Sequence, residues 1–281
     1  MPSSIDQPSS DIQSHYEQGY EAGRLFRGVG VLERVRTQEI LQRLLPPPPA
    51  TILDVGGGAG VYALWLAKQG YSVHLVDLMP LHIQQAIEAS YLQPEHPLAS
   101  ATVGDARKLA FDDASFDAVL LLGPLYHLTD RTERIGALKE AYRVLRPGGW
   151  VMAAGISRFA STLDGLHRGF MKDPEFAQIA AQDRRNGQHR NPGNHPNYFT
   201  TAFFHHPEEL RTEIELSGFQ VGHLLGIEGP GWLVPNFKEQ WEDSERRALL
   251  LQAIWELEAE PTLLGMSAHL MATGRKPLVA A

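Results

Sequence analysis

Residues 51–60 read Thr51-Ile52-Leu53-Asp54-Val55-Gly56-Gly57-Gly58-Ala59-Gly60. The first half is a short apolar run typical of a buried strand, and a glycine-rich turn follows it directly. Such a turn, placed between a strand and a helix, lets backbone amides and the helix N-terminus approach a ligand closely. The stretch therefore predicts a site for a nucleotide-like ligand at the end of the first strand.

Around this stretch, short apolar runs alternate with segments of helical periodicity. Strands are predicted at residues 51–55, 71–77, 101–103, 116–122 and 150–156. Helices are predicted after residue 60 and at residues 81–91 and 131–145. This alternation is typical of a doubly wound α/β fold with a mostly parallel sheet. Two later strands, at residues 219–227 and 267–273, bring the expected sheet to seven strands.

The regular alternation fails at both sides of this core. Helical periodicity over residues 16–45 ends at four consecutive prolines, which disfavour helix before them. Residues 157–206 lack a long clean period, and helical patterns return at residues 207–217 and 244–258. We therefore expect an N-terminal helical segment (1–45), a ligand-binding core (46–156), a cap inserted over the carboxyl edge of the sheet (157–206) and the remainder of the core (207–281).

Composition excludes several classes of function. The 281 residues include no cysteine, which rules out disulfides, thiolate zinc sites and a cysteine nucleophile. The formal charge of −8 disfavours nucleic-acid partners, which are bound mainly through Lys and Arg. The N-terminus does not look like a signal peptide, and no apolar run is long enough to span a membrane. We expect a cytoplasmic protein without a membrane partner; its oligomeric state stays open.

The glycine run allows two interpretations. Counted from Gly58, Gly58-x-Gly60-x-x-Ala63 satisfies the dinucleotide fingerprint, with Asp77 near the expected acidic position. Counted from Asp54, an acid ends the strand before three spaced glycines. A carboxylate there would repel a pyrophosphate and would favour a ligand that carries an ammonium or sulfonium.

The run from Asp54 to Gly60 resembles the first motif of class I S-adenosylmethionine-dependent methyltransferases, and further motifs match in order. They are Asp77-Leu78 at the end of the second strand, Gly104-Asp105-Ala106 after the third, Phe116-Asp117-Ala118-Val119 in the fourth, and Leu145-Arg146-Pro147-Gly148-Gly149 before the fifth. The resemblance implies S-adenosylmethionine as the cofactor. It implies that Asp77 binds the ribose hydroxyls, that Leu78 lies against the adenine, and that Asp105 meets the adenine amino group. The other cofactor residues it implies are Asp54, Gly56, Gly57, Gly58, Gly60, Ala106 and Leu122.

The N-terminal segment resembles the entry helix that some small-molecule methyltransferases fold over the cofactor. By this resemblance Tyr16 closes on the methionine end of the cofactor and Arg24 pairs with its carboxylate. Arg36 is a competing candidate for that pairing. A solvated amphipathic helix without contact to the cofactor is the alternative.

Catalytic candidates follow the fourth strand, in Leu122-Gly123-Pro124-Leu125-Tyr126-His127-Leu128. The turn at Gly123-Pro124 is expected to present Tyr126 and His127 at the carboxyl edge of the sheet. Because histidine titrates near neutral pH, His127 is the first candidate for a general base or for a group that orients the acceptor. The alternative is that His127 only binds the backbone of its own loop.

Acceptor candidates lie in and after the expected cap. Five of the twelve histidines fall between residues 167 and 206, which raises a metal site or a polar substrate pocket. Neighbouring residues in a strand point in opposite directions, so a metal shared by His205 and His206 is not expected. We predict substrate contacts from His205 or His206, from Tyr198, and from Glu228 and Trp232 after the sixth strand.

These residues favour an enzyme that moves the methyl group of S-adenosylmethionine to an O or N atom of a small, partly apolar acceptor. In-line displacement at the sulfonium carbon requires alignment, exclusion of water and, for some acceptors, removal of a proton. The alternatives are an RNA or protein methyltransferase, an NAD(P)-dependent oxidoreductase that uses the Gly58 interpretation, and a binding protein that has lost turnover.

Overall fold

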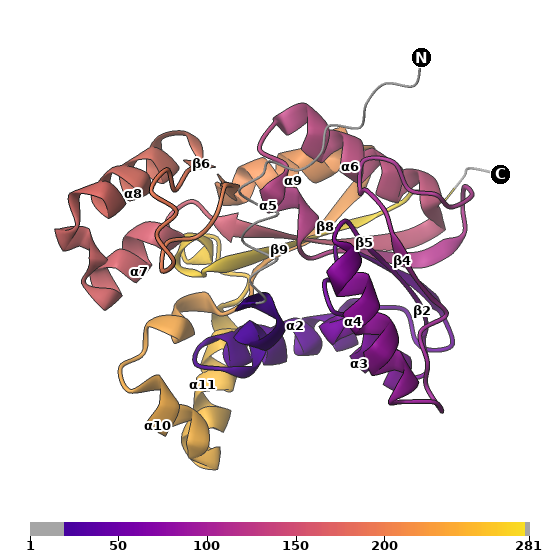
Figure 1. Cartoon of the computed structure of the whole chain (residues 1–281), viewed down its shortest axis with the longest axis horizontal. Coiled ribbons are helices and arrows are strands. Elements are labelled where there is room, and N and C mark those ends of the chain that lie inside the picture. The colour runs from indigo at the N-terminus through magenta and orange to yellow at the C-terminus, as the bar shows by residue number, and fades with distance from the viewer. Residues whose placement is uncertain (1–19, 279–281) are drawn as a thin grey trace.

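The computed structural model describes residues 20–278, and a nine-stranded sheet runs through its centre (Figure 1). The order β3-β2-β1-β4-β5 is parallel, β9 pairs antiparallel with β5, and β8 pairs with β9. The predicted α/β fold with a mostly parallel sheet is confirmed. The strands are β1 (Thr51–Val55), β2 (Ser72–Asp77), β3 (Ser100–Val103), β4 (Phe116–Leu121), β5 (Leu145–Ser157), β6 (Gln188–His189), β7 (Ala202–His205), β8 (Gln220–Gly226) and β9 (His269–Arg275).

Helices cover both faces of the sheet (Figure 1). On one face, α2 (Gly30–Leu44), α3 (Val61–Lys68) and α4 (Pro80–Tyr91) bury Ile40, Leu66 and Ile83 against the strands. On the other face, α6 (Arg131–Val144) and α9 (Pro207–Leu216) bury Leu138 and Ile214. Because both faces are covered, the central strands are apolar along nearly their whole length, as their sequence indicates.

The predicted helix over residues 16–45 is interrupted. The 3₁₀ helix η1 (Tyr20–Phe26) precedes α2, and the chain turns between them at Gly28, whose φ is +52°. A side chain at Gly30 would place its Cβ 2.2 Å from the Arg24 carbonyl oxygen, so only glycine permits this close turn. The turn brings η1 back toward the carboxyl edge of the sheet.

The segment predicted as a cap contains α7 (Ala160–Arg168), the 3₁₀ helix η2 (Phe170–Lys172), α8 (Pro174–Asn186) and β6. Its last strand, β7, belongs to the central sheet, so the sheet has more than the seven strands expected. β4 ends at Leu121, whereas β5 continues to Ser157, and β7 pairs in parallel with this free end at Ile156 and Ser157. No sequence pattern indicated this pairing, because β7 is only four residues long.

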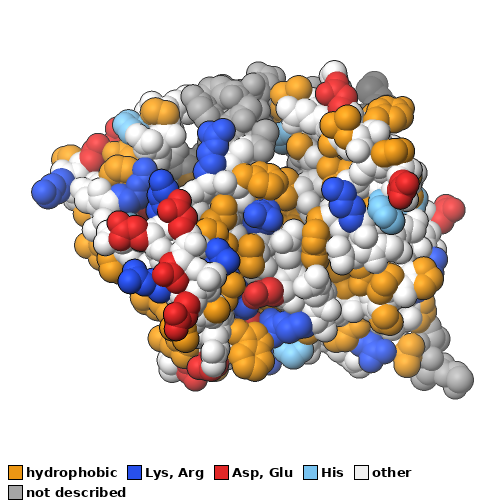
Figure 2. Space-filling view, turned by 90° about the horizontal axis from the view of Figure 1, so that it is seen from below, with side chains coloured by type: hydrophobic (Ala, Val, Ile, Leu, Met, Phe, Trp, Pro, Cys, Tyr) orange, Lys and Arg blue, Asp and Glu red, His pale blue; other side chains and the backbone are white. Residues whose placement is uncertain are grey.

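The C-terminal quarter packs beside the N-terminal helix (Figure 1). The 3₁₀ helix η3 (Gly229–Leu233) and α11 (Ser244–Leu257) supply Trp232 and Ile254, which pack with Leu32 of α2. α10 (Phe237–Glu242) and the 3₁₀ helix η4 (Leu264–Met266) complete this region. On the face shown in Figure 2, acidic and basic side chains are interspersed with apolar ones. Across residues 20–278, no helix has the length and apolar character to cross a bilayer.

Candidate functional site

A cavity of about 420 Å³ lies at the carboxyl ends of β1, β2 and β4. Its walls bring together most of the predicted cofactor residues, which the chain supplies from the glycine turn, the ends of the strands and η1. They are Arg24, Asp54, Gly56, Gly57, Gly58, Asp77, Leu78, Asp105, Ala106 and Leu122. Gly60 lies just behind this wall as the N-cap of α3, and Tyr16 falls outside the described residues.

Hydrogen bonds from backbone amides and left-handed dihedral angles fix the open conformation of the glycine turn. The Gly56 amide donates to the Val76 carbonyl at 2.7 Å, and the Gly58 amide donates to Asp77 Oδ2 at 2.8 Å. The φ angles are +68° at Gly56, +57° at Gly58 and +85° at Gly60, which favour glycine. This loop leaves room for a ligand, since no atom lies within 4 Å of the position of a Cβ on Gly58.

Asp54 is fully buried beneath this loop. Neither of its carboxylate oxygens makes a hydrogen bond of ordinary geometry to any described residue. Burial is the main cause that raises the pKa of Asp54 to about 7; the negative charge of Asp77 adds to it, and the Ala63 amide offsets part of it. A buried carboxylate in this state is suited to a cationic ligand, which would restore its ordinary charge.

A substitution in the turn tests how closely the loop is packed on Asp54. The Cβ of Gly57→Ala would lie 2.5 Å from Asp54 Oδ2, so the loop or the buried carboxylate must move. Overpacking of this kind lowers the stability of the folded protein by about 1–3 kcal/mol. We expect roughly 10-fold weaker binding of S-adenosylhomocysteine by calorimetry.

The control for this variant is Gly136→Ala in α6, where no atom lies within 4 Å of the added Cβ. Alanine at an open helical position should leave ligand binding unchanged and stabilise the helix by about 0.5–1 kcal/mol. Equal affinity of the Gly57→Ala and Gly136→Ala proteins would contradict the arrangement of loop and carboxylate described above.

Asp77 and Leu78 form the wall at the end of β2. Asp77 Oδ1 accepts from the Met79 amide at 2.9 Å and lies 3.0 Å from His82 Nδ1, while Oδ2 accepts from Gly58. Leu78 is 38% exposed although it is apolar, and it lines the cavity. An exposed leucine beside a fixed carboxylate offers a flat apolar contact next to a hydrogen-bond acceptor.

Asp105 lies across the cavity from the glycine turn, between β3 and β4. Arg107 holds its carboxylate through a hydrogen bond from Nη2 to Oδ2 of 2.7 Å and also pairs with Glu133. Although burial opposes it, Arg107 keeps the pKa of Asp105 below its usual range. This contact makes Arg107 and Glu133 part of the site, which the sequence motifs did not indicate.

A second cavity, of about 450 Å³, is lined by residues of α7, by Phe176 of α8 and by residues 196–199, and it shares Arg24 and Tyr126 with the first. Tyr126 and His127 belong to the short helix α5 (Pro124–His127) that follows β4, as the turn at Gly123-Pro124 predicts. Their ring centroids are 4.7 Å apart, and His127 lines the first cavity. Phe199 of the cap lies 6.3 Å from the Tyr126 ring and lines the second cavity.

Some of the residues predicted to contact the acceptor line the second cavity, and others line neither cavity. Tyr198 and Trp232 line the second cavity. His205 is fully buried in β7, where its Nε2 lies 3.2 Å from Glu213 Oε2, and burial lowers its pKa. His206 is exposed and caps α9. Neither histidine lines either cavity, because the short strand β7 turns His205 into the core and ends before His206.

Glu228 is also buried away from both cavity walls, where it binds His269 Nδ1 at 2.6 Å. Glu33 lies 3.8 Å from the same nitrogen. Among the described side chains of residues 23–278, these three form the one group with the spacing of metal ligands, one ligand atom of each lying within 4.8 Å of the others. Sequence analysis did not single out Glu33 or His269, which lie at opposite ends of the chain.

The two arginines proposed for the cofactor carboxylate differ in position. Arg24 lines both cavities and pairs with Glu33, with Nη2 at 2.9 Å from Oε1. Arg36 is buried in α2, where Nε donates to the Ile227 carbonyl at 3.2 Å and the guanidinium pairs with Glu258. Arg36 therefore holds the N-terminal helix to the core and does not line the cofactor cavity.

Comparison with known proteins agrees with this geometry. Residues 53–153 match the family described as methyltransferase domain. The chain is 37% identical over 109 residues to a 2-methyl-6-phytyl-1,4-hydroquinone methyltransferase of Synechocystis sp., a match that covers 38% of this chain and 32% of that protein. It is 30% identical over 171 residues to a ubiquinone/menaquinone biosynthesis C-methyltransferase of Caulobacter vibrioides, covering 55% of this chain and 64% of that protein. The chain thus spans less than two thirds of the curated relatives it matches.

The fold is also found among solved structures. A S-adenosylmethionine-dependent methyltransferase from Methanosarcina mazei superposes with a TM-score of 0.58 at 20% identity. The superposition covers 85% of this chain and 97% of that protein. Residues 53–153 therefore match a methyltransferase domain, and the chain shares its fold with a solved S-adenosylmethionine-dependent methyltransferase.

Proposed function

We propose that the protein transfers a methyl group from S-adenosylmethionine to a small, partly apolar aromatic acceptor held beneath the cap. The observation that carries this proposal is the junction of two cavities at Tyr126 and Arg24. One cavity is lined by the glycine turn and five acids, and the wall of the other includes six Phe, Tyr or Trp side chains. Donor and acceptor bound in adjoining cavities satisfy the alignment that in-line transfer requires.

The buried acid under the glycine turn supports the cofactor assignment. When bound, S-adenosylmethionine supplies a methyl group on a positively charged sulfur. Asp54 would hold a cationic part of this ligand, since its carboxylate is buried without an ordinary hydrogen bond. Asp77 would accept from the ribose hydroxyls, and Leu78 would lie against the adenine ring.

His127 is the candidate base. It ends α5 beside the cofactor cavity, and its ring is 6.0 Å from the ring of Phe199 in the acceptor cavity. Removing the proton of an aromatic hydroxyl raises the electron density on the oxygen and on the adjacent ring carbons. The expectation of an O or N acceptor finds no support in the names of the two relatives, one of which is a C-methyltransferase. We therefore propose the ring carbon beside a hydroxyl group as the methylated atom.

Product analysis tests this proposal. The protein is incubated with S-adenosylmethionine and a panel of hydroquinones, phenols and aromatic amines, and mass spectrometry with NMR locates the added methyl group. We expect a C-methylated hydroxyaromatic product. An O- or N-methylated product would show that the methylated atom is not a ring carbon. Methylation of RNA or protein, with none of any small molecule, would contradict the proposal.

A variant of His127 tests its role in the same assay. A general base contributes about 10²–10⁴-fold to the rate, so His127→Gln should lower kcat by about 100-fold or more. Binding of S-adenosylhomocysteine should change little. His206→Gln, an exposed residue at the N-cap of α9, is the matched control. Turnover of His127→Gln within a factor of two of the unmodified protein would show that His127 is not a base.

A further inference from the structure

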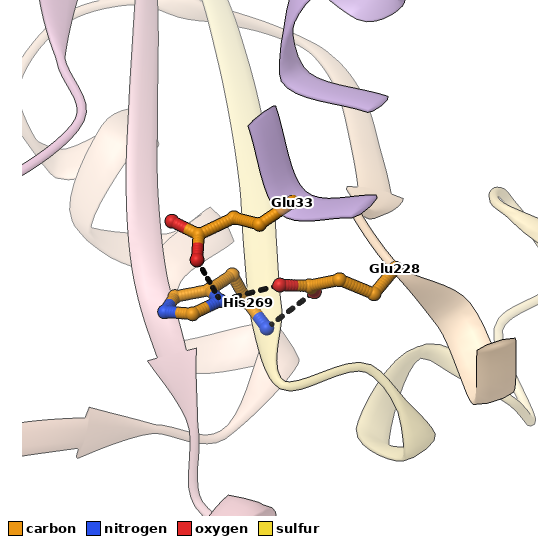
Figure 3. A group of neighbouring side chains, drawn as sticks. All are labelled: Glu33, Glu228 and His269. Atoms are coloured by element: carbon orange, nitrogen blue, oxygen red, sulfur yellow. Dashed lines mark hydrogen bonds and ion pairs between the residues drawn. The ribbon is translucent and has the colours of Figure 1, made fainter. Parts of the chain in front are cut away.

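Three side chains from distant parts of the sequence meet beside the acceptor cavity: Glu33 of α2, Glu228 between β8 and η3, and His269 of β9 (Figure 3). Glu228 binds His269 twice, through Nδ1 at 2.6 Å and through the backbone amide at 2.9 Å. Ser267 Oγ also donates to Glu228, at 2.9 Å. Glu33 approaches the same imidazole nitrogen at 3.8 Å. Both carboxylates therefore approach the same ring nitrogen, Nδ1.

The charges of this group balance when His269 carries a proton. Arg24 pairs with Glu33, so two carboxylates face one guanidinium and one imidazole. Burial lowers the pKa of His269, but Glu33 and Glu228 outweigh it and raise the pKa to about 9, against the opposing charge of Arg24. A divalent cation would have to displace the Nδ1 proton and compete with Arg24 and Ser267. The arrangement thus favours a proton over a metal ion.

The second ring nitrogen of His269 is available to a ligand. Figure 3 shows the second ring nitrogen at the end of the imidazole that points away from Glu228. Among the side chains that the structure describes (residues 23–278), none forms a hydrogen bond to Nε2, and the His269 side chain is 18% exposed and lines the acceptor cavity. A charged imidazole held in this way offers one N–H donor of fixed direction.

The rest of this cavity suits an anion with an apolar body. Arg24, Arg27 and Arg168 line it together with one acid, Asp164. Arg24 pairs with Glu33 and Arg168 lies 3.5 Å from Asp164, so among the described side chains Arg27 adds a positive charge that these acids do not balance. Aromatic rings supply the remaining wall: Phe176, Tyr198, Phe199 and Phe204.

We propose that His269 donates its Nε2–H to a carboxylate on the aromatic methyl acceptor, so that Glu33 and Glu228 set acceptor specificity through the orientation of this ring. The inference rests on the proposed function and deepens it, because it gives the chemical class of the acceptor as an aromatic carboxylate. His269 is in this sense a specificity-determining residue, and the two glutamates are positioning residues.

Paired probes of equal shape test the inference. With S-adenosylhomocysteine bound, benzoate and benzamide are titrated into the unmodified protein, His269→Gln and, as a control, the exposed His223→Gln. We expect at least 10-fold preference for benzoate in the unmodified protein and in His223→Gln, since a hydrogen bond between two charged groups is stronger than one to a neutral amide. His269→Gln should lose most of this preference and keep only the smaller part that the arginines of the cavity contribute. In the unmodified protein the preference should persist at neutral pH and fall to the level of His269→Gln above pH 9, where the ring loses its proton.

NMR of histidine labelled with ¹⁵N gives a test that does not depend on His269→Gln folding. At pH 7.5 the His269 ring should show the shifts of a doubly protonated imidazolium, and Glu228→Gln should shift it to the neutral form. A neutral ring in the unmodified protein, a metal-bound ring after addition of Mn²⁺ or Zn²⁺, or a benzoate preference that is undiminished in His269→Gln would overturn the inference. Failure of S-adenosylhomocysteine to bind the unmodified protein would instead overturn the proposed function.

Discussion

Replacing Asp77 by alanine should weaken the binding of S-adenosylhomocysteine by about 100-fold, because two hydrogen bonds to a charged group contribute about 1.5 kcal/mol or more each. Asp77 has two roles, and the substitution removes both. Its Oδ2 anchors the glycine turn through the Gly58 amide at 2.8 Å, and its carboxylate is the proposed acceptor for the ribose hydroxyls. The loss is measured by isothermal titration at constant pH and salt.

The control for Asp77→Ala is Asp112→Ala, an exposed acid outside the cavity. Removing Asp77 also removes the negative charge that raises the pKa of Asp54, so Asp54 should titrate lower in the variant. The lower pKa leaves more negative charge on Asp54, which favours a cationic ligand and partly offsets the expected loss of affinity. Affinity within threefold of the unmodified protein would therefore mean that Asp77 does not contact the ligand.

Replacing Arg134 by methionine should lower the free energy of unfolding by about 3–5 kcal/mol, the usual cost of leaving a buried charge without its partner. Arg134 is 2% exposed and binds Glu213 with Nη2 at 2.7 Å from Oε1. It also lies over the ring of Phe203, 3.7 Å from its centroid, and its Nη1 donates to the Leu128 carbonyl at 2.9 Å. The variant should also bind S-adenosylhomocysteine more weakly, because Leu128 lines the cofactor cavity.

Urea unfolding at pH 7 measures this effect, and Arg131→Met is its matched control. Arg131 lies 3.8 Å from the same carboxylate but is 57% exposed, so its loss should cost less than about 1 kcal/mol. A double replacement, Arg134→Met with Glu213→Leu, should recover most of the stability because no buried charge remains. A loss below about 1 kcal/mol for Arg134→Met alone would contradict the role assigned to this pair.

Sequence patterns predicted the part of the molecule that follows local rules. The turn from Asp54 to Gly60 requires left-handed dihedral angles, which glycine residues indicate. The apolar strands require helices on both faces of the sheet. Both features can therefore be predicted from the sequence. Tyr126 and His127 were predicted for the same reason, since Gly123-Pro124 sets the direction of the chain after β4. Most of the predicted cofactor residues do share one cavity.

Residues that depend on contacts distant in sequence were not predictable in this way. His205 was expected to contact the acceptor, but pairing of β7 with the free end of β5 turns it inward toward Glu213. Glu33 and His269 carry no motif, and only the fold of the N-terminal helix beside β9 brings them together (Figure 3). Arg36 was a plausible cofactor ligand until its burial against Glu258 was known.

The most direct test of the cofactor assignment is calorimetric titration of the unmodified protein with S-adenosylhomocysteine and, separately, with NADH. A buried carboxylate at Asp54 favours a ligand with an ammonium group, which S-adenosylhomocysteine carries, and disfavours the pyrophosphate of NADH. We expect micromolar binding of S-adenosylhomocysteine and no detectable binding of NADH. Binding of NADH without S-adenosylhomocysteine would contradict the assignment and return the Gly58 interpretation, with its oxidoreductase function, to first place.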